Sequence, residues 1–187
     1  MSLIYEPEED SYFLSEVTFQ EISKIIKSNL DLKFLEMGCG SGVNLNTALK
    51  AGIKKQNILG IDINEDSVKY CRKLGFKCFY SDLFKNVKEK FDIIIFNPPY
   101  LPDDNPYNPE YKEKFDDLKI ALVGGKNGSS VINKFLEQAK NHLNKNGKIL
   151  ILTSSLTKGI KWLDYKKKKI ASKKLFFEEL YVWELRI

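Results

Sequence analysis

Phe91-Asp92-Ile93-Ile94-Ile95-Phe96-Asn97-Pro98-Pro99-Tyr100 is the stretch of this chain that decides its fold. Its first six residues form an apolar run, which is typical of a strand buried on both faces of a parallel sheet. Proline fixes φ and lacks an N–H group, so a central strand must end at Asn97. The stretch therefore predicts a stiff loop at the carboxyl end of a central strand, where open α/β sheets bind ligands.

Further strands and helices alternate on both sides of this stretch. We expect the other parallel strands over residues 33–37, 57–61, 76–80 and 148–153. We expect helices over residues 11–30, capped by Asp10 or Ser11, and over residues 43–51 and 158–168. We also expect a helix over residues 65–74, capped by Asn64, and one over residues 129–143, ended by Asn146 and Gly147. A proline-rich loop spans residues 102–117, and a late hairpin is expected over residues 175–179 and 181–186. Alternation predicts a parallel sheet with helices on both faces, and the hairpin predicts one inserted antiparallel strand.

Composition favours one globular domain over residues 1–187. The chain has 187 residues, of which 43% are hydrophobic and 29% charged, and such a chain can fill an ordinary core. The acidic N-terminus does not resemble a signal peptide, and no apolar stretch reaches the ~18 residues of a membrane span. We therefore expect a cytoplasmic protein that does not enter a membrane.

Cysteine spacing and charge give weaker indications. Cys39, Cys71 and Cys78 form no CxxC pair, which is typical of reduced intracellular thiols rather than of disulfides or a zinc site. We therefore expect no bound metal. The net charge of +5 arises partly from the basic cluster at residues 166–174, for which a solvated surface and a contact with RNA, the ribosome or an acidic protein are alternatives. His142, the only histidine, is expected to cap or solvate a helix end.

A second ligand-binding pattern follows the first strand. Glu36-Met37-Gly38-Cys39-Gly40-Ser41-Gly42 is a glycine-rich turn, and glycines let the backbone turn sharply and approach a ligand closely. Dinucleotide-binding proteins use a related turn, and such a turn can also be purely structural.

Carboxylates at three successive strand ends make this pattern more specific. Asp62 can accept the hydroxyls of a ribose, as acidic residues do in nucleotide-binding folds. Asp82 can accept from an adenine amino group beside the Leu83 N–H, and Glu36 can hold a ligand amino group. Strand-end Asp residues are also common helix caps. An acid-lined pocket suits a cation and repels pyrophosphate, which favours S-adenosylmethionine over NAD.

The loop that ends the central strand supplies groups for a planar NH2. The Asn97 side-chain oxygen and the Pro98 carbonyl can each accept one N–H of a substrate, and Tyr100 can stack on it. Positioning of this kind needs neither a metal nor a strong general base. The sequence therefore predicts an enzyme that methylates a nitrogen by in-line displacement.

With both sites in place, the chain resembles the class I S-adenosylmethionine-dependent methyltransferases. More narrowly, it is similar to the HemK/PrmC-type release factor glutamine methyltransferases, in their short archaeal and eukaryotic branch. The resemblance rests on Tyr5-Glu6-Pro7-Glu8-Glu9-Asp10-Ser11-Tyr12-Phe13-Leu14, on residues 36–42, on Asp62-Ile63-Asn64, on residues 97–100 and on residues 124–128. It implies a Rossmann-like, mostly parallel seven-stranded sheet with helices on both faces and a C-terminal antiparallel hairpin. Residues 1–30 would cover the cofactor site.

The resemblance also implies roles for individual residues. Catalytic roles fall on Asn97, Pro98 and Tyr100, and S-adenosylhomocysteine would be the product. Cofactor contacts would come from Ser11, Glu36, Gly38, Gly40, Asp62, Asp82, Leu83 and Asn97. Ser11 stands where Thr is more usual. Bacterial members carry an extra N-terminal domain that recognises the release factor, and this chain begins almost at the catalytic domain.

The acceptor and the partner are expectations of the same kind. A glutamine side chain of a translation release factor is the expected substrate. Adenine N6 or guanine N2 of RNA or DNA, a protein lysine, and a cofactor-binding regulator without catalysis are the alternatives. In the related branch a small zinc-binding activator pairs with the methyltransferase. The aromatic, lightly charged strand Phe76–Tyr80 should be a sheet edge on which that activator could dock.

Overall fold

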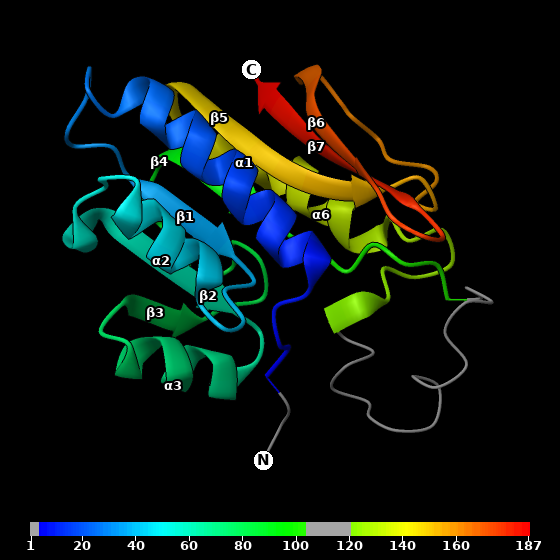
Figure 1. Cartoon of the computed structure of the whole chain (residues 1–187), viewed down its shortest axis with the longest axis horizontal. Helices are drawn as coiled ribbons and strands as arrows, with labels where there is room; N and C mark the ends of the chain where they lie inside the picture. The colour runs from blue at the N-terminus through cyan, green and yellow to red at the C-terminus, as the bar shows by residue number, and fades with distance from the viewer. Residues whose placement is uncertain (1–3, 104–120) are drawn as a thin grey trace.

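Seven strands form one sheet in the order β3-β2-β1-β4-β5-β7-β6 (Figure 1). The computed structural model describes residues 4–103 and 121–187. The strands are β1 (Phe34–Met37), β2 (Ile58–Asp62), β3 (Lys77–Tyr80), β4 (Phe91–Phe96), β5 (Leu143–Ser154), β6 (Lys166–Lys174) and β7 (Glu179–Arg186). Strands β1 to β5 pair in parallel, and β7 is antiparallel to both of its neighbours. This arrangement confirms the predicted fold class.

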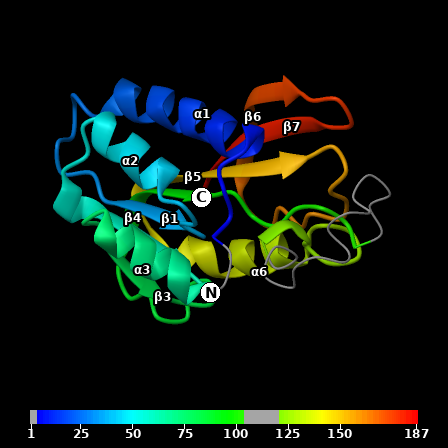
Figure 2. The ribbon, with the colours of Figure 1, turned by 60° about the horizontal axis from the view of Figure 1, so that its bottom comes forward.

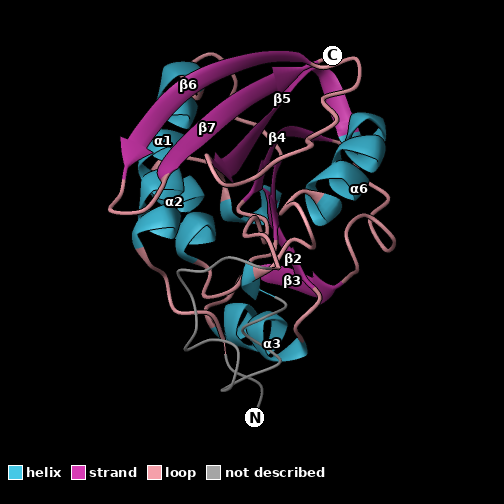
Figure 3. Cartoon of the chain, turned by 90° about the vertical axis from the view of Figure 1, so that its right-hand side faces the viewer, coloured by secondary structure: helices cyan, strands magenta, loops and turns pink. Residues whose placement is uncertain are grey.

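Helices cover both faces of the sheet. They are α1 (Glu9–Ile25), α2 (Val43–Lys50), α3 (Glu65–Lys73) and α6 (Ser130–Ala139), with short 3-10 turns η1 (Lys55–Asn57) and η2 (Lys140–His142). Helices α1 and α2 lie against one face and α6 against the other (Figures 1 and 3), while α3 packs on β2 and β3. In the part of the chain that the structure describes, each helix is too short or too polar to cross a membrane.

The predicted central strand lies in the middle of the core. Ile93, Ile94 and Ile95 of β4 are fully buried between β1 and β5. The facing run of β5, Ile149 to Leu152, is equally buried. Burial of one such side chain stabilises the fold by about 1.5–3 kcal/mol. The pairing of β4 with β1 and β5 therefore fixes the position of its carboxyl end.

The helix expected over residues 158–168 is wrong. Residues 157–165 are loop and turn, and β6 follows at once. Lysine favours helices, but here its long side chains lie on aromatic rings: Lys167 Nζ is 4.7 Å from the Trp162 ring, and Lys169 Nζ is 4.6 Å from the Tyr181 ring. These contacts and the pairing with β7 outweigh helix propensity.

One predicted helix end and one predicted strand are wrong. Asn146 and Gly147 were expected to end a helix, yet α6 ends at Ala139, and the two residues lie in an irregular stretch of β5. There Phe91 pairs with Leu143 but Ile93 with Lys148, and Asn146 has a φ of 67°. The expected late strand over residues 175–179 is mostly a turn instead, closed by the Leu175 N–H donating to the Glu178 carbonyl at 2.8 Å.

Helix starts were predicted with mixed success. Asn64 caps α3 as expected, accepting from the backbone N–H of Asp66 at 2.9 Å and of Ser67 at 3.4 Å. Helix α1 begins one residue before Asp10 and ends at Ile25, and neither Asp10 nor Ser11 is its cap. The proline-rich loop expected over residues 102–117 lies almost entirely outside the described residues.

A buried ion network joins α1 to the sheet. Lys148 of β5, 3% exposed, donates to Glu21 of α1 and to Glu184 of β7, the latter at 3.2 Å. Burial alone would raise the pKa of Glu21, but hydrogen bonds from Lys148 and Lys24 outweigh it and lower that pKa. The ionised form of Glu21 is therefore the one that stabilises the fold.

We expect Glu21→Gln to reduce the free energy of unfolding at pH 7 by about 1.5–3 kcal/mol, since charged hydrogen bonds are lost. The folded-state pKa of Glu21 lies below its ordinary value of 4.5, so this stabilisation is present above pH 4.5 and is lost as the pH falls. Denaturant unfolding of both proteins between pH 3 and pH 7, with the exposed Glu16→Gln as control, measures it. An equal deficit at every pH would contradict the assignment.

Candidate active site

A cavity of about 450 Å³ opens at the carboxyl ends of β1, β2, β3 and β4. The segment before α1 passes beside the end of β1 (Figures 1 and 2), and Tyr5 of this segment lines the cavity. Every site residue predicted from the sequence lines this cavity: Ser11, Glu36, Gly38, Gly40, Asp62, Asp82, Leu83, Asn97, Pro98 and Tyr100. The volume lies within the range of cofactor and ligand pockets.

The glycine turn is held open toward the cavity. Gly38 and Gly40 have φ angles of 67° and 45°, which favour glycine. A Cβ atom added at Gly40 would meet nothing within 4 Å. The Gly40 N–H donates to Asp62 Oδ2 and the Asn64 N–H to Asp62 Oδ1, both at 2.8 Å. Asp62 therefore fixes the turn, and each of its oxygens keeps a lone pair for a ligand hydroxyl.

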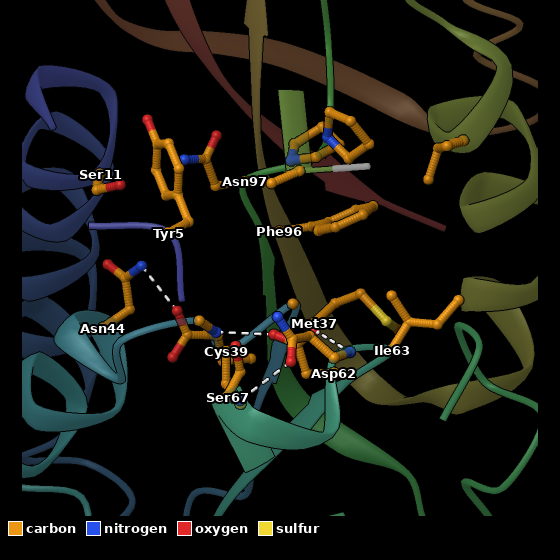
Figure 4. A pocket seen from close by; sticks show the side chains of 18 of the residues that line it. Tyr5, Ser11, Met37, Cys39, Asn44, Asp62, Ile63, Ser67, Phe96 and Asn97 are labelled. Carbon is orange, nitrogen blue, oxygen red and sulfur yellow. Dashed lines mark hydrogen bonds between the residues drawn. The ribbon is translucent and has the colours of Figure 1, made fainter. Parts of the chain in front are cut away.

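Buried acceptors without donors lie beside the turn. Glu36 is 3% exposed, and its Oε1 accepts from Asn44 Nδ2 at 2.8 Å (Figure 4). Among the described residues, Glu36 Oε2 and Asn44 Oδ1 have no hydrogen-bond partner. Burial raises the pKa of Glu36 well above its usual range, and burial also raises the pKa of Asp62. A ligand with cationic N–H donors would satisfy the unpaired acceptors and favour the ionised form of the carboxyls.

The third acidic strand end sits at the rim. Asp82 is exposed, whereas Leu83 is half-buried with a φ of 48°, a left-handed conformation that a leucine rarely adopts. The Ser81 hydroxyl donates to the Leu83 carbonyl at 2.7 Å and holds this turn. Backbone strain of this kind is concentrated at ligand-binding sites.

The Asn97 side chain has one satisfied end and one free end. Its Nδ2 donates to Asp10 Oδ2 at 2.9 Å, while its Oδ1 is buried without a partner among the described residues. Asp10, only 5% exposed, also accepts from the hydroxyls of Tyr5 at 3.2 Å and Tyr100 at 3.4 Å. Asn97 lines the cavity, and because a carboxylate holds its Nδ2, its Oδ1 is left as the unpaired acceptor of the side chain.

Tyr100 is positioned by the same carboxylate. Burial and the nearby Asp10 raise the pKa of its hydroxyl, which therefore stays a neutral donor. Its stacking on a substrate amide stays a prediction. Figure 4 shows Tyr5, Ser11 and Asn97 on one side of the pocket and Asp62 and Ile63 on the other.

Residues that the sequence did not single out complete the site. Asp10 was taken for a helix cap, and Asn44 is the second residue of α2. Neither carries a local signal for its partner, because Asp10 meets Asn97 and Asn44 meets Glu36 only through the fold. Tyr5, Ile63 and Lys134 also line the cavity.

A second turn, formed by residues 124–128, supports the loop that follows β4. The Leu101 N–H donates to the Leu122 carbonyl at 3.0 Å, and the Gly124 N–H to the Leu101 carbonyl at 2.9 Å. The Thr157 hydroxyl donates to the Tyr100 carbonyl at 3.0 Å. Gly128 lies so close to Tyr100 that a Cβ atom added to Gly128 would be 2.1 Å from the Tyr100 carbonyl oxygen.

His142 lies away from this cavity. Its Nδ1 is 3.0 Å from the Glu89 carbonyl oxygen, and its ring stacks on Phe84 with centroids 4.5 Å apart. It lies at the end of η2 but neither caps nor solvates a helix end, because its half-buried ring packs on Phe84. It does not line the cavity.

A sheet of this order, with a glycine turn and acidic strand ends at one cavity, defines the class of Rossmann-like methyltransferases. Residues 28–181 match the methyltransferase domain family. A solved structure of similar fold is the ribosomal protein L11 methylase of Lactobacillus delbrueckii subsp. bulgaricus. Its TM-score is 0.60 at 16% identity, over 97% of this chain and 81% of that one.

Relatives found by sequence indicate which methyltransferases this chain is similar to. A chain of Methanocaldococcus jannaschii assigned as a protein N5-glutamine methyltransferase is 38% identical over 97% of this chain and 92% of its own length. The release factor glutamine methyltransferase of Borreliella burgdorferi is 36% identical over 74% of this chain and 50% of its own. The eRF1 methyltransferase catalytic subunit of Schizosaccharomyces pombe is 30% identical over 77% and 69%.

The chain therefore belongs to the methyltransferase domain family, in the branch that holds the protein N5-glutamine and release factor glutamine methyltransferases. It spans nearly the full length of the archaeal relative and about half that of the bacterial one. The cofactor of this family is S-adenosylmethionine, as the sequence predicted. The unpaired buried acceptors of Glu36 and Asn44 fit its amino group.

We expect Gly128→Ala to destabilise the protein by about 1–3 kcal/mol more than Gly159→Ala, since overpacking adds to backbone strain. Both glycines have a φ near 70°, but a Cβ atom on Gly159 would meet nothing closer than 3.6 Å. The Tyr100 carbonyl must move in the first variant alone, so methyl transfer should fall there as well. Denaturant unfolding and a transfer assay compare the two. Equal stability of the variants would show that the second turn does not constrain the loop.

Proposed function

We propose that this chain transfers a methyl group from S-adenosylmethionine to the side-chain amide nitrogen of a glutamine in a translation release factor. The observation that carries this proposal is the buried, unpaired Oδ1 of Asn97, with Nδ2 of the same amide held by Asp10. An acceptor fixed in this way suits an N–H donor of a planar amide. The names of the archaeal, bacterial and yeast relatives support glutamine as the acceptor.

The mechanism rests on positioning. An amide nitrogen is a poor nucleophile because its lone pair is delocalised into the carbonyl. Asn97 Oδ1 and the Pro98 carbonyl each accept one substrate N–H, which aims the nitrogen and favours the positive charge that it gains. Well-oriented groups can lower a barrier by roughly 7–11 kcal/mol. When bound, the cofactor would supply an electrophilic methyl group on a sulfonium. Its S–CH3 bond would break as the N–CH3 bond forms, S-adenosylhomocysteine would leave, and the nitrogen would release one proton to solvent.

We propose that the cofactor binds on the side of the cavity opposite Asn97 and Pro98. Glu36 would hold the amino group, Asp62 the ribose hydroxyls, and Asp82 with the Leu83 N–H the adenine. Ser11, Gly38 and Gly40 would line the remaining surface. This assignment treats the chain as a single domain in which α1 and the segment before it cover the cofactor. Strands from both ends of the chain in one sheet support it.

We expect Asn97→Ala to lower kcat about 100-fold or more, as loss of one fixed transition-state contact does, while S-adenosylmethionine still binds. Isothermal titration measures the binding, and a labelled-methyl assay measures the transfer. Asn144→Ala is the matched control, because Asn144 bonds Asp92 at the opposite end of the sheet. Near-normal turnover by Asn97→Ala would overturn the mechanism.

We further propose that a small zinc-binding activator protein docks on β3. Strand β3 is the last of its sheet, and Tyr80 on it is 47% exposed. A free edge can add a strand from a partner. The name of the Schizosaccharomyces pombe relative, a catalytic subunit, is consistent with such a partner.

Labelled S-adenosylmethionine offered with the matching release factor, ribosomal RNA and DNA, each with and without the activator, separates the acceptors. We expect label in the release factor, lost when its acceptor glutamine is changed to asparagine, and faster transfer with the activator. Label in RNA or DNA would instead favour a nucleic-acid N-methyltransferase, and label on lysine would exclude the amide acceptor. A chain that is monomeric and fully active alone would contradict the docking proposal.

A further inference from the structure

Three cysteine sulfurs meet behind the glycine turn. Cys39 lies in the turn, Cys71 in α3 and Cys78 in β3, and their Sγ atoms all lie within 4.8 Å of one another. All three are free thiols, and each is at most 3% exposed. Their spacing in sequence indicated unrelated thiols and no metal site, and only the packing of α3 and β3 beside the turn brings them together.

The three sulfurs are spaced as ligands of one ion would be. A metal ion about 2.3 Å from each of three thiolates holds the sulfurs about 4.0 Å apart. The observed sulfurs reach that spacing by moving less than about 1 Å. Gly60 lets the cysteine side chains approach one another, because a Cβ atom at this position would lie 2.9 Å from Cys78 Sγ and 3.0 Å from Cys39 Cβ.

The ligand set indicates which ions fit. Within the described ranges, no histidine or carboxylate joins the three sulfurs, and their burial leaves them out of reach of bulk water. Structural zinc almost always takes four ligands, whereas soft ions such as Cu⁺ accept thiolate-only sets. The Nε of Arg72 donates to the Cys78 carbonyl at 2.7 Å, which places one positive charge beside the strand residue that carries one of the sulfurs.

We propose that Cys39, Cys71 and Cys78 bind one soft, thiophilic metal ion of the Cu⁺ and Cd²⁺ class. Each thiol gives up its proton to solvent and forms one metal–sulfur bond, and no atom changes its oxidation state. Cys39 is bonded between Gly38 and Gly40, and Cys71 Sγ lies 3.5 Å from the Gly40 carbonyl oxygen. An ion at this site therefore ties α3 and β3 to the turn that lines the cofactor cavity.

Cadmium titrated into the reduced, full-length chain without oxygen tests the proposal. We expect one Cd²⁺ per chain by elemental analysis, with sulfur-to-cadmium charge-transfer absorption in the ultraviolet. At a hundredfold excess over Kd, the unfolding midpoint should rise by roughly 5–10 °C. The double variant Cys71→Ala/Cys78→Ala should lose both signals. Val68→Ala, which removes a buried side chain of α3 without removing a sulfur, should keep them.

Two results would overturn the proposal: a wild-type chain that binds no stoichiometric cadmium, or a folded double variant that binds it as tightly as wild type. If the double variant does not fold, cadmium NMR of the wild-type chain decides. A chemical shift typical of three sulfur ligands supports the site, and one typical of oxygen or nitrogen ligands excludes it.

Discussion

A proline at the end of the buried central strand β4 constrains the position of the residues around the cavity. Strand β4 is fixed between β1 and β5 by fully buried isoleucines, and Pro98 allows no further pairing. The chain must leave the sheet where β1 and β2 also end. The amide of Asn97 is thereby held close to the glycine turn, and the Asp10 carboxylate, brought in by α1, sets its orientation. Rigid placement of this kind is what methyl transfer to a weak nucleophile requires.

Local sequence patterns correctly predicted the features that depend on interactions within a few residues. The apolar run of β4, the Asn64 cap and the two glycines of positive φ follow from side-chain chemistry within a few residues. Strand ends carry the acids in both the sequence and the structure. All ten predicted site residues, including Ser11 from the family resemblance, therefore line one cavity.

Contacts between distant segments were beyond the same reasoning. Six of the nine residues in β6 are lysine, and their helix propensity misled because Trp162 and Tyr181 were not known to lie beneath them. Asp10 looked like a cap, since nothing near it in sequence indicates Asn97, 87 residues away. The three cysteines looked unrelated for the same reason.

The two edges of the sheet differ in a way that limits how the molecule can assemble. Strand β6 presents a row of lysines, a feature that keeps an edge from pairing with another chain, whereas β3 at the other end is short, aromatic and lightly charged. Growth of the sheet is therefore possible in one direction only. A strand added at β3 gives a complex of one-to-one stoichiometry that ends there, and repulsion at the lysine edge opposes fibre formation.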